Sequence, residues 1–365
     1  MVRASFSRRS APMIVEAALL VALAACEGGP APSTDGRPLG VPFEGAFRLV
    51  RAVPLEERPE NPIVDPIALA IWNGELVIVD QLASDLKVFD AAGRLLRVIG
   101  RPGKGPGEFR LPRAATAVAG NRLAVLDAQG VSLFHPPDRF DRRWPAASLG
   151  GQNFAPVLGG TRLALGALAE PGQPRVRVYD LDGRLTGSFM PAARIRHLFE
   201  RNFSVLGLAS ASDRLVAADR ASSRVFVHDL ASGREAWIDL GVPPYEPPAW
   251  KELSPDASMQ AVAEWANRQM WVLQPVAVDS CRILVPFSRY DPIRDEPRIH
   301  YVLVEVCARR SGRFIVIGPT ASRFLAAEGD RFYAVTTREN GSHELSVYRL
   351  AVHPAESRSG PRDHR

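Results

Sequence analysis

Residues 75–100 read ELVIVDQLASDLKVFDAAGRLLRVIG, and residues 214–240 read RLVAADRASSRVFVHDLASGREAWIDL. In both stretches an apolar segment ends in Asp, a short loop leads to a second apolar segment, and a Gly-containing turn leads to a third. Short apolar segments divided by Gly, Asp and Asn turns are typical of β-strands in all-β proteins. Because the same order occurs twice, we expect the chain to consist of internal repeats.

Four looser copies complete the set. They begin RLAVLD, RLALGA, RILVPF and RFYAVT, at residues 122, 162, 282 and 331. One more strand and a tight turn precede each copy, which makes four strands per unit and six units. Four-stranded units of this length are typical of the blades of a β-propeller. We predict an all-β fold, a six-bladed β-propeller with a short helical insertion between blades four and five.

The two ends of the repeat array predict how the ring closes. The last copy lacks its outermost strand after Leu350, and residues 46–53 (AFRLVRAV) form a strand that belongs to no copy. We expect this strand to pair with residues 344–350 and to complete the last blade. The predicted divisions are a signal peptide (1–25), a flexible tether (26–41), the propeller (42–353) and a disordered tail (354–365).

The N-terminus has the features of an export signal. Arg3, Arg8 and Arg9 precede the apolar run AALLVALAA, which is shorter than the about 20 residues that a membrane-spanning helix needs. The tetrapeptide LAAC, which ends at Cys26, resembles the lipobox of bacterial lipoproteins. The resemblance implies that Cys26 becomes the first mature residue and carries lipid, with the protein in the cell envelope facing the periplasm or the cell exterior. An ordinary N-terminal helix with a buried Cys is the alternative.

The charge distribution argues against a nucleic-acid partner. The 45 Lys and Arg residues exceed the 40 Asp and Glu residues by five, and the two signs are interleaved along the chain. No basic run of the kind that binds phosphate backbones occurs. We expect a monomer whose partners are the membrane, through the lipid anchor, and an unidentified protein, peptide or glycan.

A glycine-rich stretch connects the first two blades. Residues 100–112 read GRPGKGPGEFRLP, and Asp127 follows the second strand after it. The pattern G-x-G-x-G-E-F-x-x-P resembles the NHL repeat of six-bladed propellers. That superfamily includes scaffold and interaction proteins, peptide-amidating lyases and related metal-dependent hydrolases. The resemblance therefore implies a fold and leaves the activity open.

Strand order predicts which face would carry a site. With strands named A to D from the channel outward, all A–B and C–D turns are tight. The long connections, residues 100–112, 190–203, 241–270 and 287–298, are D–A or B–C connections and share the other face, here called the loop face. Loops on a rigid scaffold carry most binding residues. We expect a site on the loop face, at the mouth of the central channel.

The connection 241–270 contains a predicted helix and many aromatic side chains. Ser254 is the expected N-cap and Pro255 the first helical residue. The apolar stripe consists of Met259, Val262, Ala263, Ala266 and Met270. The aromatic residues are Tyr245, Trp250, Trp265 and Trp271. They either fix the helix to the ring, which we favour, or form a lid or platform over a ligand.

The segment SRYDPIRDEP brings charge to the same face. The candidate ligand-contacting residues are Trp250, Trp265, Arg289, Tyr290, Asp291 and Arg294. A charged loop that is merely solvated is the alternative.

No catalytic residue or metal ligand set is evident. The seven histidines form no H-E-x-x-H motif and no zinc-like spacing with Cys. Asp80, Asp127 and Asp219 recur directly after strand B, which predicts that their carboxylates accept backbone N–H groups in turns. No cofactor is predicted, and a Ca²⁺ or Zn²⁺ site assembled from distant blades stays open.

Cys281 and Cys307 remain once Cys26 is acylated. They begin and end two segments that we expect to be antiparallel neighbours, so their Cα atoms should lie within the roughly 4.4–6.8 Å that a disulfide requires. An oxidising compartment permits the bond, which would clamp the base of the loop 289–298. Two reduced, buried cysteines are the alternative.

Two functions are consistent with the sequence. The first is a lipid-anchored extracytoplasmic propeller that binds or scaffolds a protein, peptide or glycan. The second is a propeller enzyme, a lyase or lactonase-like hydrolase, with its site at the channel mouth. The sequence favours the first and does not decide whether the protein is an enzyme.

Overall fold

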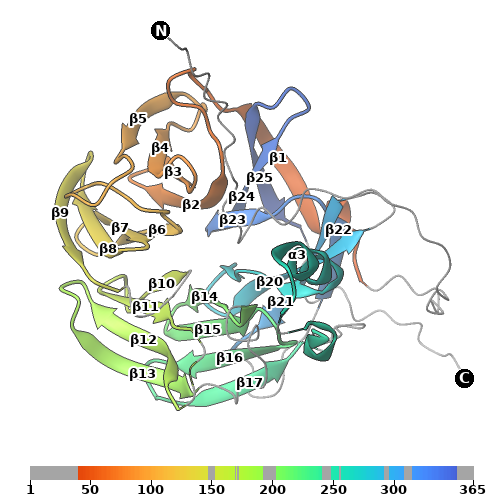
Figure 1. Cartoon of the computed structure of the whole chain (residues 1–365). Coiled ribbons are helices and arrows are strands. Elements are labelled where there is room, and N and C mark those ends of the chain that lie inside the picture. The colour runs from red at the N-terminus through yellow and green to blue at the C-terminus, as the bar shows by residue number, and fades with distance from the viewer. Residues whose placement is uncertain are drawn as a thin grey trace, which may run out of the picture.

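The computed structural model describes residues 40–146, 153–168, 170, 172–191, 203–240, 248–254, 256–291, 296–307 and 315–351. Within these residues the strands form six antiparallel sheets, and Figure 1 shows the sheets arranged as blades around a central axis. The predicted six-bladed β-propeller is confirmed. No helix in the described part of the chain is long and apolar enough to span a membrane.

Each sheet is built from strands that follow one another in the chain. The first sheet holds β2 (Pro66–Trp72), β3 (Glu75–Asp80), β4 (Asp85–Phe89) and β5 (Leu95–Ile99), and the second holds β6 (Ala114–Val118), β7 (Arg122–Asp127), β8 (Gly130–His135) and β9 (Arg139–Trp144). The third holds β10 (Phe154–Val157), β11 (Arg162–Gly166), β12 (Pro174–Asp180) and β13 (Leu185–Pro191). The fourth holds β14 (Leu206–Ala211), β15 (Arg214–Asp219), β16 (Arg224–Asp229) and β17 (Glu235–Asp239). The fifth holds β18 (Trp271–Val272), β19 (Val276–Ala277), β20 (Arg282–Asp291), β21 (Glu296–Glu305) and β22 (Ile315–Thr320).

The sixth sheet joins the two ends of the ring. It contains β23 (Phe324–Glu328), β24 (Arg331–Thr337), β25 (His343–Leu350) and, outermost, β1 (Phe47–Pro54). β1 pairs antiparallel with β25, from Phe47 opposite Leu350 to Pro54 opposite Glu344. The predicted closure by the N-terminal strand is therefore confirmed. We call this sheet the closing blade.

Local sequence explains the hairpins that build the blades. Asn73 and Gly74 join β2 to β3 with φ angles of 54° and 75°. Two successive positive φ angles define the turn that best matches the twist of a two-residue hairpin, and Asn-Gly is the pair that adopts them most readily. The next strand, β3, is buried on both faces because it lies inside a blade that is covered by blades on either side.

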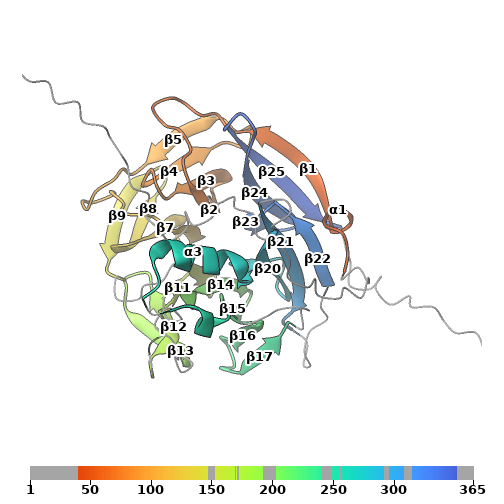
Figure 2. The same ribbon diagram turned by 45° about the vertical axis from the view of Figure 1, so that its right-hand side comes forward.

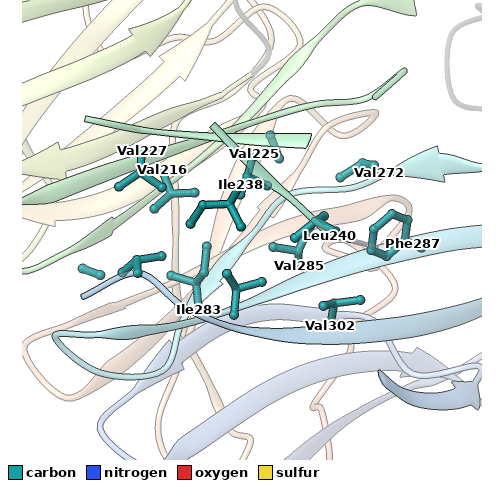
Figure 3. Close-up of a cluster of buried hydrophobic side chains, with 14 residues drawn as sticks. Val216, Val225, Val227, Ile238, Leu240, Val272, Ile283, Val285, Phe287 and Val302 are labelled. Carbon is teal, nitrogen blue, oxygen red and sulfur yellow. The ribbon is translucent and has the colours of Figure 1, made fainter. Parts of the chain in front are cut away.

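The core lies between neighbouring blades. Figure 3 shows one such layer, in which valine, isoleucine and leucine side chains of β15, β16 and β17 face those of β20 and β21. The side chains labelled there are Val216, Val225, Val227, Ile238, Leu240, Val272, Ile283, Val285, Phe287 and Val302. Each blade is thus stabilised by both of its neighbours, and the ring depends on its closure.

The helical insertion lies between the sheets β14–β17 and β18–β22. It consists of a short 3-10 helix, η2 (Trp250–Glu252), and α3 (Met259–Arg268). Because β1 belongs to the closing blade, that blade is the first that the chain enters. Counted from it, α3 lies between the fifth and sixth blades, which are the fourth and fifth sheets in the order given above and the fourth and fifth blades of the sequence-based count. The only other described helix is α1 (Phe43–Ala46), just before β1.

The helix also starts later than expected. The hydroxyl of Ser258 accepts a hydrogen bond from the backbone N–H of Ala261 at 3.2 Å and is the N-cap. Ser254, the expected cap, accepts instead from Asp256 in a separate turn. Two serines four residues apart compete for the same role, and the apolar stripe does not distinguish them.

Candidate functional site

The long connections gather on one face of the ring, as the strand order requires. Every inner strand begins at this loop face, and every B–C hairpin has its tip there. Figures 1 and 2 show α3 standing on this side of the propeller, and α3 contacts β20. The helix and the β20–β21 hairpin therefore form neighbouring parts of one surface.

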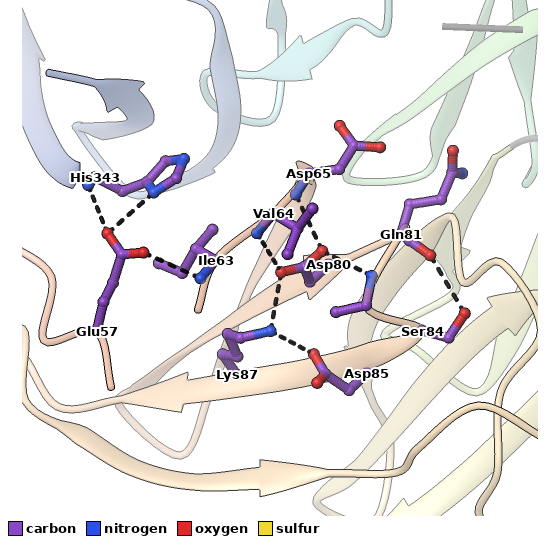
Figure 4. Close-up of polar contacts among 11 residues, drawn as sticks. Glu57, Ile63, Val64, Asp65, Asp80, Gln81, Ser84, Asp85, Lys87 and His343 are labelled. Carbon is purple, nitrogen blue, oxygen red and sulfur yellow. Dashed lines mark hydrogen bonds and ion pairs between the residues drawn. The ribbon is translucent and has the colours of Figure 1, made fainter. Parts of the chain in front are cut away.

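Buried carboxylates hold the connections of the loop face in place through hydrogen bonds from backbone N–H groups. Asp80 is fully buried and accepts backbone N–H groups from Val64 at 2.8 Å, Asp65 at 3.0 Å and Ala83 at 3.2 Å. Figure 4 shows how this one side chain joins the connection before β2 to the turn after β3. The predicted structural role of the recurrent aspartates is confirmed here.

Lys87 completes this network from the next strand. Its ammonium group, 1% exposed, lies 2.9 Å from Asp80 and 2.7 Å from Asp85. Burial raises the pKa of the Asp85 carboxyl, although the Lys87 ammonium opposes the rise. A buried charge is tolerated only when it is paired and hydrogen-bonded, and this cluster meets that condition.

The next two recurrent aspartates serve the same purpose in different ways. Asp127 accepts the backbone N–H groups of Arg110 at 2.9 Å, Gln129 at 2.8 Å and Gly130 at 3.0 Å. Asp219 accepts one backbone N–H, from Ala221, and pairs with Arg175 of the neighbouring blade.

Arg175 is itself 2% exposed and donates to the carbonyl of Ser204 at 2.6 Å. It therefore ties β12 to the connection before β14. Arg175 is a residue that sequence reasoning missed, because its partner Asp219 lies 44 residues away and only the ring brings them together.

The closing blade has a carboxylate of its own. Glu57 accepts the backbone N–H of His343 at 2.7 Å and that of Ile63 at 3.1 Å, and the His343 ring lies 3.1 Å away (Figure 4). Burial alone would raise the pKa of the Glu57 carboxyl, but these hydrogen bonds outweigh it and hold the pKa below its ordinary value. Glu57 thus ties the segment after β1 to the start of β25.

The glycine-rich stretch 100–112 also has a structural explanation. Glu108 accepts from the backbone N–H of Gly105 at 2.8 Å and from Arg101 at 2.9 Å. A Cβ on Gly103 would lie 2.0 Å from the Glu108 carboxylate, so a larger residue there would displace this side chain from its hydrogen bonds. Phe109 is fully buried between two blades. The pattern G-x-G-x-G-E-F therefore folds a loop around a glutamate and buries a ring.

The aromatic residues around α3 form a packed cluster. Trp265 and Trp271 are buried, at 2% and 7% exposure, and Phe203 contacts both, with ring centroids 5.6 and 5.2 Å away. Trp250 is half-buried and lies 5.1 Å from Trp265. The guanidinium of Arg220 lies 5.1 Å from the Trp271 ring centre, a cation–π distance.

The burial of these tryptophans favours a structural role, in which they fix the helix to the propeller, over a lid or platform for a ligand. Together with Val262 and Leu253, the tryptophan side chains pack α3 against the propeller. Trp265, a candidate ligand contact, is too buried to offer its ring to a ligand, whereas Trp250 keeps part of its surface accessible. Tyr245 lies outside the described residues.

The charged segment differs from the expected loop. β20 and β21 are paired without interruption from Arg282 opposite Glu305 to Asp291 opposite Glu296. Most of residues 287–298 is therefore strand. Each of these strands has ten residues against six in β15 and β16, which extends the hairpin by roughly 13 Å at about 3.3 Å per residue.

The candidate residues on this hairpin fall in different positions. Arg289 is exposed and Asp291 half-buried, each near the loop-face end of β20. Tyr290 lies between them in the same strand, and Arg294 lies outside the described residues. Burial lowers the pKa of His300 on β21, and the charge of Arg289 lowers it further.

The disulfide expected from the sequence is present. Cys281 and Cys307 are bonded, with Cα atoms 5.1 Å apart. The bond does not clamp the base of a loop at 289–298, however. It lies at the start of β20 and the end of β21, so the full length of both strands separates it from the loop face.

No group of three or more His, Cys, Asp or Glu side chains placed to hold a metal ion occurs among the described residues. The signal peptide, most of the tether with Cys26, and residues 352–365 lie outside them.

Comparison with known proteins supports the fold. A family model described as a 6-bladed beta-propeller matches residues 40–135, which include β1, the sheet β2–β5 and the first three strands of the next sheet, β6–β8. No curated protein matches the chain.

Two solved structures from Bacteroides are similar over nearly their full length. A Bacteroides fragilis protein thought to be exported has a TM-score of 0.59 and 14% identity, with 86% of this chain and 97% of that chain covered. A DUF4221 family member from Bacteroides vulgatus also has a TM-score of 0.59, at 10% identity, with 84% and 99% covered. At these identities the likeness extends to the fold alone.

Proposed function

We propose that the mature protein is a lipid-anchored, extracytoplasmic β-propeller that binds or scaffolds a protein, peptide or glycan on its loop face. The observation that carries the binding site is the long charged hairpin of β20 and β21, which extends toward the loop face beside α3. A projecting element on a rigid ring presents a fixed surface to a partner, and a preorganised surface loses little entropy on binding.

Rigidity of this face is a second support. The carboxylates of Asp80, Asp127 and Glu57 hold the connections at their bases, and the tryptophan cluster holds α3. The contact residues in this proposal are Trp250, Arg289, Tyr290, Asp291 and Arg294. The NHL-like stretch at residues 100–112 belongs to the same proposal, because the superfamily that it resembles includes scaffold and interaction proteins.

The extracytoplasmic location is supported by two features. A disulfide joins Cys281 and Cys307, and such bonds persist in oxidising compartments. One of the similar folds belongs to a protein thought to be exported. In this proposal Cys26 carries the lipid.

Labelling tests the anchor. Cells that express the wild-type protein are fed a palmitate analogue, and the protein is partitioned in detergent. The wild type should carry label and enter the detergent phase, whereas Cys26→Ser should do neither. An unlabelled, water-soluble wild-type protein would remove the anchor.

Site-specific photo-crosslinking in cells tests the binding face. The crosslinker is placed at Met259 on α3 or at Arg289 on β20, both exposed on the loop face. Matched positions on the opposite face are Asp182 and Asp330, in tight turns with exposed side chains. Adducts should form from the first pair and not from the second. Equal yields from both faces, or no adduct from either, would refute binding at the loop face.

A further inference from the structure

The outermost strand of the closing blade has an unusual surface. In β1 all five residues from Arg48 to Ala52 are exposed. Leu49 and Val50 are 51% and 47% exposed, and an arginine flanks them on each side. Figures 1 and 2 both show β1 on the outer rim of the ring.

Edge protection accounts for part of this surface. An outermost strand has unpaired backbone groups, and charged side chains or a bulge discourage pairing with another chain. Arg48 and Arg51 supply the charge, and the pairing register shifts between Leu49 and Arg51, which leaves Val50 without a cross-strand partner. Protection of an edge does not account for two adjacent exposed aliphatic side chains.

The arginines of this surface are not neutralised. Within the part of the chain that the structure describes, neither Arg48 nor Arg51 has an ion-pair partner. The nearest acidic side chains after the strand are already engaged, Glu56 with Arg58 at 2.9 Å and Glu57 with His343. Before the strand, Glu44 is the one acidic residue between positions 40 and 47.

The chain enters the ring on this side. Val41 bridges to Ile317 of β22, and its carbonyl accepts the N–H of Gly318 at 3.2 Å. Between Cys26 and Gly40 lie only thirteen residues, which span at most about 50 Å when fully extended. An anchor at Cys26 therefore keeps the rim beside β1 within about 50 Å of the bilayer.

We propose that Arg48, Leu49, Val50 and Arg51 form a docking surface for a bilayer of anionic phospholipids; this inference rests on the lipid anchor proposed above. The aliphatic side chains enter the interface between headgroups and acyl chains, and the guanidinium groups bind lipid phosphates. Because β1 lies along the rim, docking sets the ring on its edge. Both faces of the propeller then stay open to the surrounding compartment.

A fluorescent probe on the lipidated protein tests the contact. Ala52 is exposed on β1, and Ser188 is exposed on β13, across the ring in Figure 1. Ala52→Cys and Ser188→Cys each add one reactive thiol, since Cys281 and Cys307 are bonded and Cys26 is acylated in the proposal. Each labelled protein is mixed with vesicles of phosphatidylglycerol and phosphatidylethanolamine that contain a quencher at the headgroup. Vesicle flotation first establishes whether the protein is anchored.

The proposal predicts strong quenching of the probe at position 52 and little at position 188. Replacing Arg48 and Arg51 by Gln in the Ala52→Cys protein should weaken docking about 25-fold, since each arginine near an anionic surface contributes about fivefold. The matched control, Arg184→Gln with Arg234→Gln, removes the same charge from exposed turns elsewhere on the ring and should leave the quenching unchanged.

Three results would overturn the inference. Equal quenching at both positions in a floating protein, or no effect of the β1 arginine pair, would refute the docking surface and leave the anchor standing. A protein that does not float would refute the anchor and the docking together.

Discussion

Phe47 offers the sharpest test of how the ring closes. Its side chain is 2% exposed, although it begins the outermost strand. Its ring centroid lies 4.8 Å from that of Phe324, 5.3 Å from Phe332, 5.1 Å from Phe43 and 6.1 Å from Tyr301 of the neighbouring blade. Truncation of a buried Phe to Ala costs about 3–5 kcal/mol, and four ring contacts place Phe47 in the upper half of this range.

Phe47→Ala should therefore lower the free energy of unfolding by about 4–5 kcal/mol. At about 2 °C per kcal/mol for a domain of this size, the midpoint of thermal unfolding should fall by about 8–10 °C. Calorimetry on the mature chain with Cys26→Ser measures this directly. Leu49→Ala is the matched control, since Leu49 lies in the same strand but is 51% exposed, and it should change stability by less than about 0.5 kcal/mol. Equal effects of the two substitutions would show that β1 does not close the ring.

Three further substitutions test the Glu57 hydrogen bonds, the buried Lys87 ion pairs and the disulfide between Cys281 and Cys307. Because the pKa of Glu57 is lowered by folding, its stabilising contribution is present above its unfolded pKa and lost as the pH falls through the folded value. The stability difference between wild type and Glu57→Gln, measured by urea unfolding, should shrink between pH 6 and pH 3, and a constant difference would contradict this. Lys87→Met leaves buried carboxylates without their cation and should cost about 3–5 kcal/mol, whereas Arg94→Met on an exposed pair should cause no measurable change; similar losses would disprove the buried network. Replacing Cys281 and Cys307 by Ala opens a loop of 26 residues and should lower the free energy of unfolding by about 3–4 kcal/mol in the chain-entropy description, while an unchanged denaturant midpoint would show that the bond contributes nothing.

The fold was accessible from the sequence because each blade is a local unit. Strand alternation, tight turns that contain Gly, Asp or Asn, and the order of apolar segments all act over a few residues, and they repeat six times. Even the closure by β1 followed from counting, since one strand was left over near the start of the chain and one was missing from the last unit. The helix start was missed because Ser254 and Ser258 are equally good caps, and only packing of Val262 and Trp265 selects the later one.

The candidate site was less accessible because its geometry depends on contacts between blades. The pair of Arg175 and Asp219 joins two blades, and no local sequence pattern predicts it. Trp265 was a reasonable ligand contact by residue type, yet its burial depends on Phe203, whose place in the cluster only the ring determines. Beyond Phe287 the sequence predicts a loop, because Pro292 and Pro297 interrupt the strand pattern, whereas the structure has a paired hairpin.

Intact mass spectrometry of the mature protein, purified from membranes without reductant, tests the central claim most directly. A lipid-anchored propeller in an oxidising compartment predicts a chain that starts at Cys26, carries the added mass of its acyl groups, and lacks two hydrogens because Cys281 and Cys307 are bonded. A chain that starts at Met1 with three free thiols and no added mass would contradict both the anchor and the location.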